Sequence, residues 1–253
     1  MTVIDATTIT PLTHAEAMGL LERELERTIA MLRSLDDDEW TMQTDCPDWD
    51  VRSMYLHVLG ASEAGASMRE NVHQLRKAYA HRRRHDGPLE AALSGLQVRE
   101  RADISPADLV ARLEVVAPKT VKGRRRTPGL VRNHAKLKID GPVHETWKLG
   151  YLIDTIYLRD MWMHRVDASR ATGRPLVLAN DHDGRIIADV VGEWGRRHGR
   201  PFVLELEGEA GGTFAQDPDS PDAEHLTIDA VEFCRTLAGR NPATGLLTTI
   251  VPF

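Results

Sequence analysis

Apolar side chains recur at spacings of three and four residues through the first two-thirds of the chain, and this pattern restricts the fold most. Its first stretch begins near a capping box at Thr13–Glu16 and carries Met18, Leu21, Leu25, Ile29 and Leu32. Such spacing places the residues on one face of an amphipathic helix. Three more long helices are predicted, over about 49–85, from Ser105, and over about 143–171. Four long amphipathic helices in succession predict an antiparallel four-helix bundle.

The character of the sequence changes near Arg174–Pro175. After a helix predicted over about 180–198, short strand-like segments alternate with turns, and a helix is expected from Asp229 to Gly239. The strands are expected at 202–206, 212–215, 225–228 and 246–251. The sequence therefore predicts an α+β protein with two domains: a helical bundle over 1–174 and a small α+β domain over 175–253.

Composition narrows the class of protein. The formal net charge of −6 argues against a surface that binds nucleic acid. No apolar segment is long enough to cross a membrane, and the first residues lack the pattern of a signal peptide. The two cysteines, Cys46 and Cys234, indicate no disulfide framework. We therefore expect a cytoplasmic protein with small-molecule partners, no nucleic-acid partner and no membrane partner, whose oligomeric state the sequence does not indicate.

The predicted fourth helix has polar residues where a core-facing stripe should be apolar. Asp160, His164 and Asp167 continue the stripe that begins with Leu149, Ile153 and Ile156. A buried carboxylate or imidazole is costly unless it is paired or binds a metal. Residues at i and i+4 lie about 6 Å apart along one helix face, so Asp160 and His164 could share one cation. The alternative is an ordinary Asp–His pair on a helix.

A third ligand could come from the predicted second helix. His57 precedes a run of small residues that leaves room beside it, either for a neighbouring helix or for a ligand: Gly60, Ala61, Ala64 and Gly65. Together with the pair on the fourth helix, His57 would complete a three-ligand set with open coordination positions, as a catalytic metal requires. On its own, such a histidine is more often structural, and Cys46 is expected to be a packing residue.

Two segments resemble one family. Trp40, the stretch Cys46–Arg52 (CPDWDVR) and His57 resemble the start of the second helix in the DinB-like, mycothiol-dependent maleylpyruvate isomerase family. The stretch 160–167 (DMWMHRVD), followed by 172–175 (TGRP), resembles the fourth-helix motif of that family. The ending, which includes 237–240 (LAGR), is similar to its C-terminal domain, which is related to sterol-carrier-like folds. Residues between about 75 and 140 contain no matching motif.

The resemblance implies a metal site and a cosubstrate. In that family one divalent metal, usually taken to be zinc, is held inside the bundle, and by resemblance its ligands here are His57, Asp160 and His164. The acid is Glu in the isomerase itself and Asp here, which weakens any assignment of the isomerase's own substrate. The resemblance also implies mycothiol as cosubstrate.

These expectations lead to a hypothesis about function. A metal with an open coordination position could hold a nucleophile, either a small thiol in its thiolate form or a water. The nucleophile would then act on a small electrophile, by S-transfer to it or by its isomerisation. Asp167 could accept the N–H of a ligand imidazole, or could pair with Arg165 or Arg170. The main alternative is a non-catalytic protein that binds a metal or small ligand in the same bundle. A lipid-binding role for the C-terminal domain rests on fold analogy.

Overall fold

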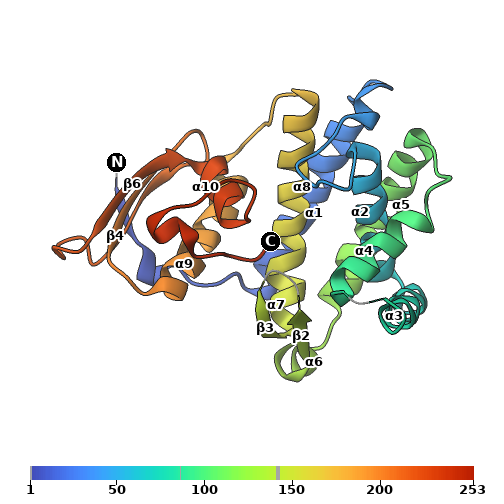
Figure 1. Cartoon of the computed structure of the whole chain (residues 1–253), viewed down its shortest axis with the longest axis horizontal. Helices are drawn as coiled ribbons and strands as arrows, with labels where there is room; N and C mark the ends of the chain where they lie inside the picture. The colour runs from blue at the N-terminus through green and yellow to red at the C-terminus, as the bar shows by residue number, and fades with distance from the viewer. Residues whose placement is uncertain (1, 86, 141–142) are drawn as a thin grey trace. The chain divides into compact units, whose positions relative to one another are not determined.

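The computed structural model describes residues 2–85, 87–140 and 143–253. The chain divides into two compact units, one of His14–Pro175 and the other of Met1–Thr13 with Leu176–Phe253 (Figure 1). The predicted α+β class is confirmed, with a helical N-terminal region and a small sheet region. Among the described residues, no helix combines the length and the apolar character needed to cross a membrane.

Four long helices form the core of the first unit. They are α1 (His14–Leu32), α2 (Val51–Ala66), α5 (Pro106–Arg125) and α8 (Tyr157–Thr172). α5 packs on α1 and α2, and α8 packs on the same two helices (Figure 1). The apolar stripe predicted for the first helix is buried throughout, with Met18 and Leu21 fully enclosed. Burial of this stripe in the bundle provides most of the stability of such a helix.

The predicted second helix is interrupted. α2 ends at Ala66, and α3 (Met68–Arg82) begins directly after Ser67. Ser67 has extended backbone angles and its side chain accepts from the Glu70 N–H, so it caps the new helix. The following α4 (Leu89–Arg99) was not predicted, although it contacts both α2 and α3. α3 and α4 therefore form a layer beside α2.

The predicted fourth helix is shorter than expected. Residues from His144 onward form β3 (His144–Lys148), which pairs antiparallel with β2 (Lys136–Asp140) after the short helix α6 (Gly129–His134). The prediction of a helix from Val143 was wrong there because the alternating polar and apolar residues of the two strands favour a hairpin. The helical segment begins with α7 (Leu149–Tyr151), continues through a π-helical turn at Leu152–Ile156, and ends at Gly173 in a left-handed conformation.

The second unit contains a four-stranded sheet in the order β1-β5-β4-β6. Its strands are β1 (Val3–Asp5), β4 (Phe202–Glu207), β5 (Gly212–Gln216) and β6 (Glu224–Asp229). β5 runs antiparallel to β4, whereas β1 is parallel to β5 and β6 is parallel to β4. The N-terminal residues, assigned to the helical domain from the sequence, thus belong to this sheet because β1 pairs with a strand more than 200 residues away.

Two helices lie beside this sheet, α9 (Arg185–His198) and α10 (Ala230–Leu237) (Figure 1). Trp194 of α9 joins them to it, with ring centroids 4.7 Å from Phe202 and 5.3 Å from Phe233. The strand predicted at 246–251 was wrong, since Gly245–Thr248 is a 3-10 turn. Val251 is buried, and its backbone N–H donates to the carbonyl oxygen of Leu237 in α10 instead of pairing with a strand of the sheet.

Candidate metal centre

Local capping fixes the position of His57 in the bundle. The Asp50 carboxylate accepts a hydrogen bond from the Ser53 N–H at 2.7 Å, which sets the start of α2 at Val51, six residues before His57. Trp49 stacks on the imidazole of His57 with ring centroids 5.1 Å apart and an interplanar angle of 27°. The ring of His57 is thereby held flat against the indole and directed toward α8.

The three side chains named from the sequence come together between α2 and α8. The Oδ2 of Asp160 lies 3.8 Å from the Nε2 of His57, and its Oδ1 lies 3.3 Å from the Nε2 of His164. One donor atom from each residue lies within 4.8 Å of the other two. Zinc ligands with bonds of about 2.1 Å in a tetrahedron are about 3.4 Å apart, so a small contraction would bring these donors onto one ion.

Two buried amides determine which nitrogen of His57 carries the proton. Gln74 donates its side-chain N–H groups to the carbonyl oxygen of Gly60 at 2.9 Å and to Glu70 at 2.8 Å, and neither partner atom is a donor. Gln74 must therefore present its oxygen to Gln97, which donates to it at 2.8 Å. The oxygen of Gln97 then lies 2.7 Å from Nδ1 of His57. Nδ1 must donate, so the neutral form of the ring has its lone pair on Nε2, the nitrogen that faces Asp160.

His164 is buried without satisfying its ring nitrogens. Its side chain is 6% exposed, and neither nitrogen forms a hydrogen bond of acceptable geometry with any residue in the described part of the chain. Buried polar atoms of this kind call for an explanation, and a bound ion is one of the common ones. The donor set, with no hydrogen bond of acceptable geometry at Nε2 of His164, fits a divalent cation held by His57, Asp160 and His164.

Charge in the site is strongly coupled. Burial disfavours protonation of His164, but the Asp160 carboxylate outweighs it and raises the pKa of His164 well above its usual value. Burial likewise opposes ionisation of Asp160, yet His164 and then His57 hold the pKa of Asp160 well below its usual value. An anionic carboxylate thus faces a protonated imidazole, and a cation bound there would replace that proton.

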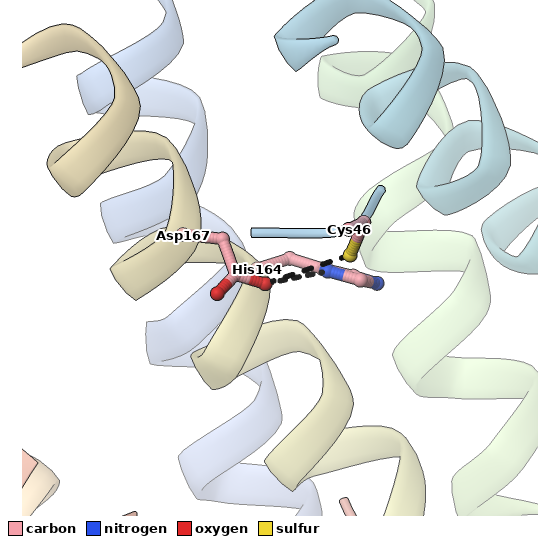
Figure 2. Close-up of side chains that lie close together, drawn as sticks. All are labelled: Cys46, His164 and Asp167. Atoms are coloured by element: carbon pink, nitrogen blue, oxygen red, sulfur yellow. Dashed lines mark hydrogen bonds and ion pairs between the residues drawn. The ribbon is translucent and has the colours of Figure 1, made fainter. Parts of the chain in front are cut away.

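Asp167 and Cys46 lie on the other side of the His164 ring (Figure 2). The Oδ2 of Asp167 is 3.6 Å from Nδ1 of His164 and accepts from the Cys46 thiol at 3.8 Å. Of the arginines weighed as partners for Asp167, Arg165 contacts Glu24 at 2.6 Å and Arg170 contacts Asp45 at 3.4 Å. Both arginines thus have another carboxylate nearby, and the carboxylate of Asp167 lies within ion-pair distance of the His164 ring.

Several residues near the site were not anticipated. Cys46, expected to be a packing residue, has its sulfur within 4.8 Å of donor atoms of His164 and Asp167. Gln74 and Gln97 lie in the region without a recognisable motif, and polar residues of an amphipathic helix are normally expected on the surface. The small residue Gly60 adjoins them: an added Cβ would come within 2.6 Å of Gln97. The small residues after His57 were expected to leave room for a neighbouring helix or for a ligand, and at Gly60 the room is taken by the neighbouring helix α4.

Comparison with known proteins identifies the family. The family model of the mycothiol maleylpyruvate isomerase N-terminal domain matches residues 21–169, which is more than half of the chain. The chain belongs to this family. No curated protein matched the chain.

Two solved structures share the fold. The crystal structure of a mycothiol-dependent maleylpyruvate isomerase matches with a TM-score of 0.57 and 16% identity, covering 91% of this chain and 90% of that chain. A histidine-to-alanine mutant of a mycothiol-dependent maleylpyruvate isomerase matches with a TM-score of 0.57, 15% identity and the same coverage. At these identities, the likeness shows that the arrangement of elements is common to both proteins.

Proposed function

We propose that this protein is a metal-dependent enzyme that uses a low-molecular-weight thiol, mycothiol, in S-transfer to, or isomerisation of, a small electrophile. Family membership supports the thiol, because the related solved structures are described as mycothiol-dependent. The metal is proposed from the site itself. The two arguments are independent, since the first depends on the sequence match and the second on the positions of side chains.

We assign His57, Asp160 and His164 as ligands of one divalent ion, zinc. The observation that carries this assignment is the convergence of three donors from two helices within 4.8 Å, with Nε2 of His57 left free to bind by the Gln97 contact. An imidazole that donates from its other nitrogen to a fixed acceptor is the usual arrangement of a metal-bound histidine. Two neutral imidazoles and one carboxylate form an accepted zinc ligand set.

The remaining residues determine what this site can do. A divalent ion with an open position, when bound, would lower the pKa of a small thiol and hold it as the nucleophilic thiolate. Asp160 is one-third exposed, so solvent reaches the site at this carboxylate. Trp49 covers the face of His57 and limits the directions of approach. Asp167 would keep the proton of His164 on Nδ1, so that Nε2 stays free to bind the ion.

Metal content tests this proposal. Elemental mass spectrometry of the purified protein should find about one zinc or similar ion per chain, and His57→Ala and His164→Ala should each lose it while keeping their helical circular dichroism. His73→Ala is the matched control, because His73 lies with Glu70 and Glu100 in a cluster of the first unit that shares no residue with the proposed site. The control should keep its metal.

Three results would count against the proposal. Stoichiometric metal in His164→Ala would remove the ligand assignment. Absence of metal in the wild type, even after incubation with zinc, nickel or manganese, would favour a non-catalytic ligand-binding protein. With metal present, no turnover of electrophiles such as maleylpyruvate in the presence of mycothiol would limit the protein to metal binding.

A further inference from the structure

A buried cation lies close to the candidate metal centre. Arg124, near the end of α5, is 6% exposed, and its guanidinium carbon lies 3.7 Å from the centroid of the Tyr157 ring. Its Nε is enclosed without an acceptor. Across the described ranges 2–85, 87–140 and 143–253, no carboxylate lies within ion-pair distance of this guanidinium and none of its nitrogens makes a hydrogen bond.

Two other buried arginines in the same unit, Arg165 and Arg101, have anionic partners. Arg165 contacts Glu24 at 2.6 Å, and Arg101 contacts Glu70 at 3.0 Å as well as Glu63. Removing a guanidinium from water is costly unless it is paired, and the face of an aromatic ring offsets only part of that cost. The guanidinium of Arg124 could therefore bind an anion, and no described residue provides one.

The position of Arg124 relates it to the metal centre. Tyr157 precedes Asp160 by three residues on α8, which corresponds to about 4.5 Å along the helix axis. Burial lowers the pKa of Arg124, whereas the charges of Tyr157 and Asp160 oppose this change, which confirms that Asp160 is near. On the α2 side, a Cβ added to Gly65 would lie 3.1 Å from Nε of Arg124, so this glycine leaves space for the guanidinium.

We propose that Arg124 binds a carboxylate group of the electrophilic substrate and thereby holds its reactive carbon beside the metal centre. This inference rests on the proposed function and adds a positioning residue, which would hold the substrate through a carboxylate a few bonds from the carbon that the thiol attacks. A guanidinium binds a carboxylate through two parallel N–H donors, which fixes orientation as well as position. Tyr157 keeps the plane of the guanidinium fixed from one face, so the fork of donors is oriented before the substrate arrives.

Binding of an unreactive dicarboxylate tests the assignment. Succinate and its uncharged analogue dimethyl succinate are titrated by calorimetry into the protein as purified. The wild type should bind succinate and should not bind the diester. Arg124→Met, which keeps the volume and removes the charge, should weaken succinate binding by about tenfold or more. Arg125→Met is the matched control, because Arg125 is half exposed and contacts Glu22 at 3.3 Å, and it should bind succinate normally.

Several outcomes would overturn the proposal: no binding of succinate by the wild type, equal binding of the diester, or wild-type affinity in Arg124→Met. If Arg124→Met loses its helical circular dichroism, Arg124→Lys decides, because it keeps the charge but loses the paired donors and should bind several-fold more weakly than the wild type. Wild-type affinity in Arg124→Lys would then refute the paired-donor geometry.

Metal content measured on the same samples separates the two proposals. Arg124→Met should keep its metal, so a loss of succinate binding there reports on the anion site alone. A wild type without metal whose succinate binding needs Arg124 would remove the proposed function and keep the anion site. A metal-loaded wild type whose succinate binding does not depend on Arg124 would keep the proposed function and remove the anion site.

Discussion

Replacing Gln97 by Leu tests whether the buried amides control the metal site. The substitution keeps the approximate volume but removes the acceptor for Nδ1 of His57 and the donor for the oxygen of Gln74. Gln74 is 1% exposed, so its unpaired oxygen should lower the free energy of unfolding by about 1–3 kcal/mol. The imidazole of His57 is more exposed, at 14%, and should contribute little to that loss.

The larger effect is expected on metal affinity. Without Gln97, the proton of His57 can move to Nε2, the nitrogen proposed to bind the ion. Loss of such an outer contact typically lowers metal affinity by about 10–100-fold. Chelator competition measures the affinity, and nitrogen-15 NMR of the histidine side chains identifies the tautomer of His57 in metal-free protein.

Gln74→Leu is the comparison variant. It leaves Gln97 beside His57 but removes the contact that fixes the orientation of the Gln97 amide, so His57 should show both tautomers and affinity should fall less than in Gln97→Leu. The reasoning is refuted if Gln97→Leu keeps the Nδ1–H tautomer and binds metal within twofold of the wild type. In that case, the bundle would orient His57 by packing alone, through Trp49.

Three further predictions concern charge and capping. The raised pKa of His164 keeps its ring protonated in the metal-free protein, so the metal must displace that proton. Metal affinity should therefore increase by up to about tenfold per pH unit while the proton remains, and then level off. A pH-independent affinity in chelator competition would exclude His164 as a ligand. Glu24→Leu leaves the buried guanidinium of Arg165 without this partner and should cost about 3–5 kcal/mol in chemical denaturation, against little change for Glu114→Leu, whose contact with Arg33 is exposed. Ser67→Ala should cost about 1 kcal/mol by loss of the α3 cap, and an unchanged midpoint would indicate that α3 is held by packing alone.

The sequence predicts the parts of this structure that depend on local periodicity. The stripe from Met18 to Leu32 is buried as expected, and the polar positions of the fourth-helix stripe, Asp160 and His164, do face His57. Helix geometry alone puts Asp160 and His164 on one face, so that part of the prediction needs no knowledge of the other elements. The approach of His57 from α2 depends on helix packing, and the family resemblance implied it.

Features that depend on distant partners were not predicted. β1 has only three residues, which is too short for a recognisable strand pattern, and it forms a strand because it pairs with β5. The strand at residues 144–148 was missed for a local reason, because its alternating residues pair with the adjacent β2 and lie directly before the helical pattern that begins at Leu149. Gln97 and Arg124 look like surface residues of amphipathic helices, and only the packing of α4 and α5 against α2 buries them.

X-ray absorption at the zinc edge tests the central claim most directly. The zinc-loaded protein should show only nitrogen and oxygen neighbours, from two imidazoles and one carboxylate, and addition of mycothiol should introduce one sulfur at about 2.3 Å. The most informative contrary result is a sulfur neighbour before any thiol is added that disappears in Cys46→Ala, because the ion would then lie at Cys46, His164 and Asp167. A spectrum that does not change when the thiol is added would contradict the proposed role of the metal in holding it.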